Sequence, residues 1–373
     1  KISMKNSFKR TLYHWIVCHS QKIKSFRGGW MLTHLFIQDY KTKRASYWKI
    51  AQIHKKGWSY NDWALLGITN ANKQQYLSTR EYCSLHPFNG TYSSWIDDKL
   101  ILKYILACTK ADKYMPAYYF QIIANGKVVP LMDAEECYRN GEIEDIANCL
   151  KEKKGLAFKQ IKGSLGVGFY KAIYKNEDDT YWLNDEGYNR QEFIHKISSL
   201  SGYLITELLL PHSEFAKYCS QSVGCLRYIL GRTQDRKLQE IYSFMRFGTE
   251  KSKFVENFNA GGVLVIVNNG CYNGGYILDF ESYKKKAIVV HPDNNIPLKG
   301  CIPHWEEVVK AAKTIAEVMP QMEYMGIDFC ITHQDKVKII EINSLTSLDS
   351  FQLDKSIFET QGGFFFKERL KCN

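Results

Sequence analysis

Three oxygen-bearing side chains stand near the ends of two apolar stretches close to the C-terminus. Asp328 lies within the first stretch, and Glu341 and Asn343 end the second. Because residues i and i+2 of a strand point to the same face, we expect Glu341 and Asn343 to share a face, with Ile342 on the opposite one. The turn at 332–336 folds the chain back and can place Asp328 across from them.

This pattern allows two interpretations. Acids and amides at the edge of a sheet are commonly solvated, or they cap a turn. Carboxylate and amide oxygens are also the ligands that Mg²⁺ prefers, and phosphate oxygens then complete its coordination. Residues elsewhere in the chain must decide between a solvated edge and a magnesium site that acts on a phosphate.

A glycine-rich loop follows a lysine in the stretch FKQIKGSLGVGF. The residues concerned are Lys159, Gly163, Ser164, Gly166 and Gly168. Glycines between two strands can offer backbone N–H groups to phosphates, and a lysine ammonium is a compact charge suited to phosphate. The loop is not a Walker A motif, and a strand follows where a dinucleotide fingerprint requires a helix. A flexible β-turn is the competing interpretation.

A candidate hinge follows in the stretch YLITELLLPHSE. The backbone from Glu207 through Leu208 to Leu209 can hydrogen-bond the edge of an adenine. Glu214 lies seven residues after Glu207 and can accept from ribose hydroxyls. The alternative is an acid that ends a strand, followed by an unrelated acid in a loop.

In this order, these segments resemble the ATP-grasp superfamily over about Asp98 to Leu353. In that family two lysines and a glycine loop hold phosphates, a hinge acid and a ribose acid follow, and an acid, a Glu and an Asn bind Mg²⁺. The corresponding residues here are Lys99, Lys159, Gly163–Gly168, Glu207, Glu214, Asp328, Glu341 and Asn343. The spacing of the last three is similar to that in D-alanine–D-alanine ligase-like enzymes, which favours the magnesium interpretation.

The stretches SVGCLRYIL, ENFNAGG and MGIDFCIT resemble the sugar-transfer-associated branch, which is linked to surface-polysaccharide assembly. One position departs from the family pattern. Many ATP-grasp ligases carry an arginine two residues before the metal-binding acid, where this chain has Gly326. Arg227 and Arg246 on neighbouring strands are the candidates to meet the substrate anion, although a strand arginine such as Arg227 can also simply pair with an acid.

The resemblance implies carboxylate–amine ligation through an acyl phosphate, with ATP and two Mg²⁺ ions, for which Mn²⁺ can substitute. Lys159, Arg227 and Arg246 are then the expected catalytic residues. The expected substrates are the carboxylate of a sugar acid, free or in a glycan, and an amino acid or small amine. A peptide ligase, a phosphotransferase of the same fold and a nucleotide-binding scaffold remain as alternatives.

The implied fold is α+β, with two lobes that clasp ATP. We expect a basic, mainly helical region at 1–97, a small lobe with the glycine loop at 98–206, and a large lobe with the metal site at 207–373. Within this plan, Ser94–Ala107 reads as one helix, with Ser94 or Asp97 near its N-cap.

Positive charge is concentrated at the N-terminal end. Residues 1–60 contain thirteen Lys and Arg against the single acid Asp39, whereas the whole chain carries +11. Such a region suits an anionic glycan or a lipid-linked acceptor, and no nucleic-acid-binding motif accompanies it. Apolar residues recur among the lysines at helical spacing: Phe8, Leu12, Trp15, Ile16 and Ile23. They predict either a helix docked on the core or a helix at a membrane surface.

The composition, 45% hydrophobic and 24% charged, is that of a globular protein. No apolar run reaches the roughly 18 residues of a transmembrane helix, and no secretory signal is recognisable. The eleven cysteines include no C-x-x-C pair, which argues against a disulfide framework and a structural zinc site. We therefore expect a cytoplasmic protein, with the inner face of the cell membrane as a peripheral location.

Overall fold

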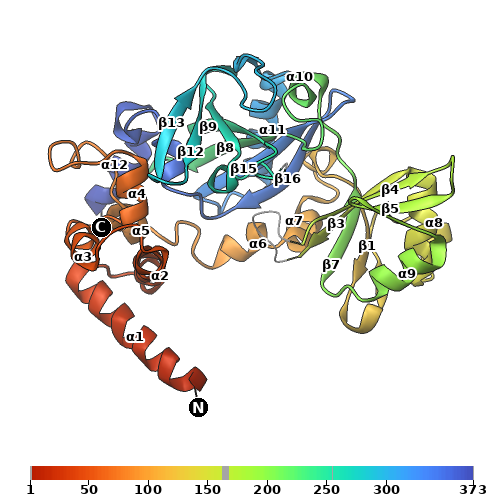
Figure 1. The fold of residues 1–373 in the computed structure, drawn as a ribbon, viewed down its shortest axis with the longest axis horizontal. Coiled ribbons are helices and arrows are strands. Elements are labelled where there is room, and N and C mark those ends of the chain that lie inside the picture. The colour runs from red at the N-terminus through yellow and green to blue at the C-terminus, as the bar shows by residue number, and fades with distance from the viewer. Residues whose placement is uncertain (1, 162–167, 254, 373) are drawn as a thin grey trace.

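The computed structural model describes residues 2–161, 168–253 and 255–372, apart from the side chains of residues 2–10 and 125. Two seven-stranded sheets, antiparallel throughout, form the centres of two lobes (Figure 1). Helices pack against both sheets and form the N-terminal region. This arrangement confirms the predicted α+β class.

The small lobe contains the sheet with strand order β2-β1-β7-β3-β4-β5-β6. Its strands are β1 (Tyr118–Ile122), β2 (Val128–Pro130), β3 (Gly155–Gln160), β4 (Tyr170–Lys175), β5 (Thr180–Leu183), β6 (Glu186–Tyr188) and β7 (Tyr203–Glu207). Helices α8 (Ile143–Lys153) and α9 (Arg190–Ser198) cover one face of this sheet (Figure 1). Phe158 and Phe193 are fully buried between the sheet and α9.

The large lobe contains the sheet with strand order β13-β12-β10-β9-β8-β15-β16. Its strands are β8 (Cys225–Arg232), β9 (Leu238–Phe247), β10 (Val263–Ile266), β12 (Gly275–Asp279), β13 (Lys284–Ile288), β15 (Tyr324–Ile331) and β16 (Val337–Asn343). Every residue of β8 and β15 is buried, as expected for central strands covered on both faces. Helix α11 (Trp305–Val318) buries its apolar stripe against this core. The short helices α10 (Ser213–Ala216) and α12 (Gly363–Cys372) complete the lobe.

The N-terminal region is helical, as predicted. It comprises α1 (Ile2–Gln21), α2 (Phe26–Thr42), α3 (Tyr47–Lys55), α4 (Tyr60–Leu65) and α5 (Thr79–Ser84). Serines cap four of these helices by accepting a backbone N–H, which explains where α2 to α5 begin. Trp58 and Tyr82 share a hydrophobic core with strands of the large lobe, whereas α1 projects from the body (Figure 1). The proposed domain boundaries at 97/98 and 206/207 stay predictions.

The segment predicted as one helix over Ser94–Ala107 forms two. Helix α6 (Ser93–Asp97) ends at Asp98, whose backbone is extended, and α7 (Lys99–Leu106) begins directly after it. The Asp98 carboxylate accepts hydrogen bonds from the backbone N–H groups of Leu100 and Ile101. Asp98 is therefore the N-cap, and it places Lys99 at the first position of α7.

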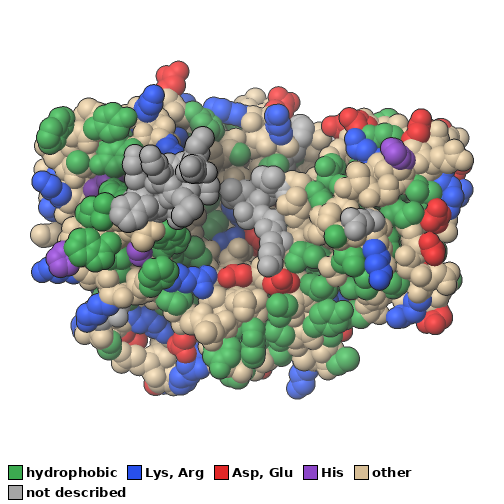
Figure 2. Space-filling model, turned by 90° about the horizontal axis from the view of Figure 1, so that it is seen from below, with side chains coloured by type: hydrophobic (Ala, Val, Ile, Leu, Met, Phe, Trp, Pro, Cys, Tyr) green, Lys and Arg blue, Asp and Glu red, His purple; other side chains and the backbone are tan. Residues whose placement is uncertain are grey.

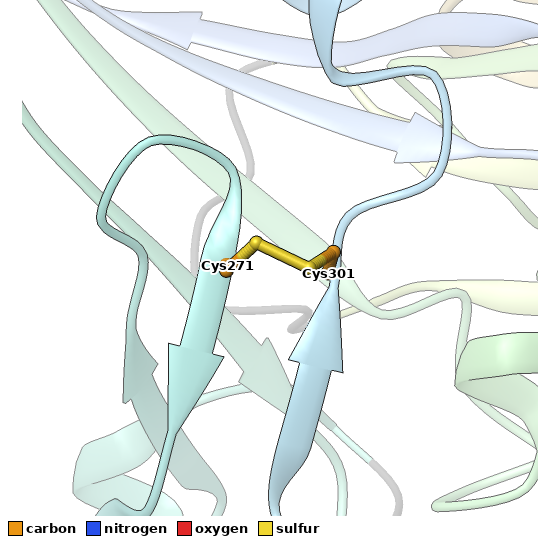
Figure 3. Close-up of a disulfide and its surroundings, with 2 residues drawn as sticks. All are labelled: Cys271 and Cys301. Atoms are coloured by element: carbon orange, nitrogen blue, oxygen red, sulfur yellow. A yellow bond between two sulfur atoms is a disulfide. The ribbon is translucent and has the colours of Figure 1, made fainter.

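The cysteines depart from the prediction at one point. Cys271 and Cys301 form a disulfide between β11 (Cys271–Asn273) and β14 (Lys299–Cys301), where they are direct cross-strand partners (Figure 3). The other nine cysteines are free, so the chain has one disulfide and no framework of them. The two residues lie 30 positions apart in the sequence, and no local pattern shows that they pair.

Two carboxyl groups interact electrostatically between the N-terminal helices and the C-terminal segment, namely those of Asp62 and Asp349. The Asp62 carboxylate accepts a hydrogen bond from Thr79 Oγ1 at 2.6 Å. Burial, and then the nearby Asp349, raise the pKa of Asp62 to about 7. Asp62 thus binds its proton more tightly in the folded chain than in the unfolded one. The stability that this proton confers is complete at low pH and is lost as the pH rises to about 7.

We expect Asp62→Asn to stabilise the protein increasingly, relative to wild type, between about pH 4 and about pH 7, because the variant has no carboxyl proton to lose there. The quantity to measure is the difference in melting temperature between variant and wild type at each pH. Asp178→Asn changes an exposed aspartate and serves as the control. A difference that does not change with pH for Asp62→Asn would contradict this assignment.

Candidate active site

The pairing of β15 with β16 decides which of the predicted metal-site residues meet. Asp328 lies directly opposite Glu341, and Gly326 lies opposite Asn343. A bulge shifts the register just after Asp328, so that Phe329 pairs with Ile339. Direct cross-strand partners share a face, so Asp328 and Glu341 do. Ile342 is buried on the opposite face, in the core, as predicted.

Two arginines hold the Asp328 carboxylate, which is only 2% exposed. Arg227 on β8 binds both carboxylate oxygens, with Nη2 2.6 Å from Oδ2. Arg246 on β9 donates from Nη2 to Oδ2 at 3.2 Å. Burial acts to raise the pKa of Asp328, but Arg227 and Arg246 hold it below its ordinary value. Asp328 thus anchors two guanidinium groups, and its predicted role as a metal ligand stays a prediction.

The structure also accounts for the glycine where many family members have an arginine. A Cβ atom on Gly326 would lie 3.2 Å from Arg227 Cδ and 2.4 Å from Thr346 Cγ2. The side chain of Arg227 therefore lies over Gly326, and the position leaves no room for a side chain of its own. A guanidinium is present at this place, but it comes from the neighbouring strand.

Arg246 has hydrogen-bonding capacity left over. Its Nη2 donates to Asp328 and also to Cys225 Sγ, at 2.7 Å. Its Nε is buried and has no hydrogen-bond partner among the residues that the structure describes. A buried guanidinium N–H without a partner is costly, and an anionic group of a substrate would satisfy it.

Glu256 and Cys225 belong to this cluster, although no sequence pattern predicts a role for either. Burial raises the pKa of the Glu256 carboxyl, and Arg246 partly opposes that shift. Glu256 begins the ENFNAGG stretch, which resembles the sugar-transfer-associated branch. Cys225 is the direct cross-strand partner of Arg246. Such cross-strand neighbours cannot be read from a single sequence.

Two lysines approach Glu341 from other elements. Lys99 Nζ of α7 lies 3.3 Å from Glu341 Oε2. Lys159 projects from β3 of the small lobe, where burial and then the charge of Lys99 lower its pKa to about 8, while Glu341 acts in the opposite direction. Two ammonium groups whose charges act on each other favour an anion beside them, and the phosphates of a nucleotide are such an anion.

Glu341 and Asn343 fit a magnesium ion better than Asp328 does. Asn343 Nδ2 lies 3.3 Å from Glu341 Oε1, so the carboxylate and the amide are adjacent. Both side chains are only partly buried, in contrast to Asp328. A carboxylate oxygen and an amide oxygen on one face are suitable ligands for Mg²⁺ next to phosphate.

The predicted hinge lies where β7 ends. The Glu207 carboxylate accepts the backbone N–H of Ala117 at 3.1 Å, so this side chain holds the segment before β1. Leu208 and Leu209 follow β7 directly, and the pairing of Leu156 with Glu207 extends the β3–β7 ladder up to them, so the adenine contact predicted for this backbone stays a prediction. Glu214 is exposed and binds Lys217 at 2.6 Å, and no contact joins it to the other predicted residues among those described.

Part of the glycine loop can be placed. Gly163, Ser164 and Gly166 lie outside the described residues. Gly168, just before β4, has φ +71°, and a Cβ atom there would lie 2.8 Å from Gln160 Nε2. The left-handed backbone and the close approach both require glycine at this position.

The lowered pKa of Lys159 predicts how ATP binding depends on pH. Phosphate favours the ammonium form, so ATP binding should take up a proton and weaken as the pH rises above about 8. We expect the dissociation constant to rise up to about tenfold per pH unit between about pH 8 and pH 9. Calorimetry in two buffers of different ionisation enthalpy measures both the affinity and the proton uptake. Lys159→Arg stays charged and should lose this dependence, and an unchanged pH slope in that variant would refute the assignment.

Several solved structures are similar to this chain. D-alanyl-alanine synthetase A from Vibrio cholerae O1 biovar eltor is 12% identical, with a TM-score of 0.42, over 76% of this chain and 67% of that one. The ATP-grasp ligase PsnB, complexed with its minimal precursor, is 12% identical, with a TM-score of 0.40, over 77% and 64%. An ADP complex of N5-carboxyaminoimidazole ribonucleotide synthetase is 12% identical, with a TM-score of 0.36, over 69% and 46%. The chain thus spans under half the length of that synthetase.

The curated proteins include no match to this sequence. A family described as sugar-transfer associated ATP-grasp matches residues 84–361, which is well over half of the chain. The matched range contains both sheets and all the residues of the candidate site. The chain belongs to the sugar-transfer associated ATP-grasp family.

Proposed function

We propose that this protein is an ATP-dependent carboxylate–amine ligase. A substrate carboxylate oxygen attacks the γ-phosphorus of ATP, the bond from that phosphorus to ADP breaks, and an acyl phosphate forms. An amine nitrogen then attacks the acyl carbon, phosphate leaves with the electron pair of the broken C–O bond, and the amine proton passes to solvent. The products are an amide, ADP and phosphate.

The observation that carries this proposal is the adjacency of two sets of positive charge. Lys99 pairs with Glu341, whose charge also acts on Lys159, and Arg227 and Arg246 bind Asp328. Because Asp328 and Glu341 are direct cross-strand partners, the two sets adjoin on one face of the β15–β16 hairpin. A polyphosphate beside the lysines would face a carboxylate beside the arginines, which is the juxtaposition that phosphoryl transfer to an acid requires.

On the ATP side, Lys99 and Lys159 would neutralise the phosphates, and the glycine loop before β4 would cover them. The backbone of Leu208 and Leu209 would meet the adenine edge, and Glu214 would meet the ribose after a local rearrangement. Glu341 and Asn343 would hold Mg²⁺, with Asp328 as the third predicted ligand. The ion would supply charge neutralisation on the transferred phosphoryl group.

On the acid side, Arg227 and Arg246 would hold the substrate carboxylate. The unpartnered Nε of Arg246 is the donor that supports this role most directly. Asp328 would keep both guanidinium groups in place, since its two oxygens bind them. The sugar-transfer association of the family supports a sugar acid as the carboxylate and an amino acid or small amine as its partner.

The test is ADP release from Mg²⁺-ATP against a matrix of sugar acids and amines, with mass spectrometry of each mixture. We expect ADP only when an acid and an amine are both present, and a product lighter by one water than their sum. Amino acids that serve as the acid would make the protein a peptide ligase. A product heavier by one phosphate, formed without an amine, would make it a phosphotransferase and overturn the proposal.

A control separates turnover from contaminating ATPase activity. Lys159→Ala should abolish the ADP that depends on both substrates, because it removes an ammonium group from the proposed phosphate site. Lys310→Ala removes an exposed lysine of α11 and should leave that activity unchanged. Equal activity in the Lys159→Ala variant would show that the ADP comes from another source.

A further inference from the structure

The outward face of α1 is apolar. Leu12, Trp15 and Ile16 are 49%, 63% and 45% exposed, and their spacing places them on one stripe of the helix. The opposite stripe, which includes His14 and Val17, is buried and packs towards α2. A surface helix normally presents polar residues to solvent. The exposed apolar face of α1 therefore indicates a surface that binds a partner.

Basic groups border this apolar stripe. A groove of about 530 Å³ runs beside it and is lined by Trp15, Cys18, His19, Lys22, Ile23 and Lys24. Phe26, which is 75% exposed, begins α2 and has its ring 5.0 Å from that of His14. The end of α1 therefore combines aromatic rings with two lysines in the turn that follows it.

The charge of residues 1–60 also favours an anionic partner. Residues 1–60 carry thirteen basic side chains and one acid, Asp39, which is fully buried in a hydrogen bond with His54. The exposed charge of the described side chains in residues 11–60 is thus positive. On the side of the N-terminal helices, Figure 2 shows hydrophobic side chains interspersed with Lys, Arg and His.

We propose that the outward face of α1, defined by Leu12, Trp15 and Ile16 with Lys22 and Lys24, docks on an anionic lipid bilayer. The apolar side chains would enter the headgroup region, where aromatic rings are favoured, and the lysines would contact lipid phosphates. No helix of the described residues is long and apolar enough to cross a membrane. This inference stands independently of the ligase reaction.

The experiment is co-sedimentation of the full chain with vesicles of phosphatidylcholine that contain roughly one third phosphatidylglycerol. We expect binding to these vesicles, little binding to phosphatidylcholine alone, and weakening with added salt. The triple variant Leu12→Ser, Trp15→Ser, Ile16→Ser should bind about tenfold more weakly. The double variant Lys22→Gln, Lys24→Gln should also bind more weakly and show a smaller dependence on salt.

The matched control is Val289→Ser with Phe364→Ser, which removes two well-exposed apolar side chains elsewhere and should leave vesicle binding unchanged. Equal binding by the triple variant would overturn the proposal. The proposal would also be overturned if the wild-type protein did not bind vesicles but formed a dimer that the triple variant does not form. The outward face of α1 would then join two copies of the chain. ADP formation from soluble substrates should be unchanged in the triple variant, so a failure here is distinguishable from a failure of the ligase assignment.

Discussion

Glu341→Gln is expected to lower substrate-dependent ADP formation by at least about tenfold, because it removes a charged ligand from the proposed magnesium site. The carboxylate of Glu341 also balances Lys99, whose Nζ lies 3.3 Å away. The variant should therefore need a higher Mg²⁺ concentration for half-maximal activity. Steady-state rates measured across a magnesium titration give both quantities.

Glu317→Gln is the matched control, since it makes the same chemical change at an exposed position of α11 and should leave the magnesium titration unchanged. More than about a tenth of wild-type turnover in Glu341→Gln, at the same magnesium requirement, would contradict the metal role. Melting curves in EDTA would show whether the variant folds.

Asp328→Asn is expected to destabilise the protein even when no metal is present. It removes the negative charge that Arg227 and Arg246 share in a site only 2% exposed. Removal of one partner from a buried ion pair costs roughly 3 kcal/mol, because the remaining charge is left uncompensated. We expect a lower melting temperature in EDTA and a higher KM for the acid substrate, since both arginines lose their anchor.

This variant separates two roles for Asp328. If the carboxylate were chiefly a metal ligand, Asp328→Asn would melt in EDTA at or above the wild-type temperature. Without a bound cation the carboxylates of Asp328 and Glu341 would repel each other, and the variant removes one of these charges. Glu341→Gln in the same buffer is the comparison, and its loss of stability should be the smaller because Glu341 is more exposed than Asp328. Equal losses of thermal stability in the two variants would contradict the anchoring role of Asp328.

Local patterns in the sequence were sufficient for part of the site. The period of two in a strand placed Glu341 and Asn343 on one face and Ile342 in the core, as the structure confirms. Residue identities were sufficient to predict the α+β class, the helical N-terminal region and the family. Each of these inferences depends on neighbours along the chain or on a sequence of motifs.

Other features depend on contacts between distant segments. If the register of Phe329 with Ile339 continued without the bulge, Asp328 would face Ile340, and Glu341 would point to the other face. The bulge thus joins the register that pairs the two acids to the different register of the rest of the hairpin. Arg227 covers Gly326 only because β8 pairs with β15, about 100 residues later in the chain.

The sequence by itself therefore determined which charged groups are present, in which order, and on which face of their own strand they lie. Only the tertiary structure decided that Asp328 binds two arginines, that Glu341 meets Lys99, and that the outward face of α1 remains uncovered. The physical reason is that strand pairing and side-chain packing depend on the whole core. A propensity or a spacing contains no information about which distant segment will supply the partner.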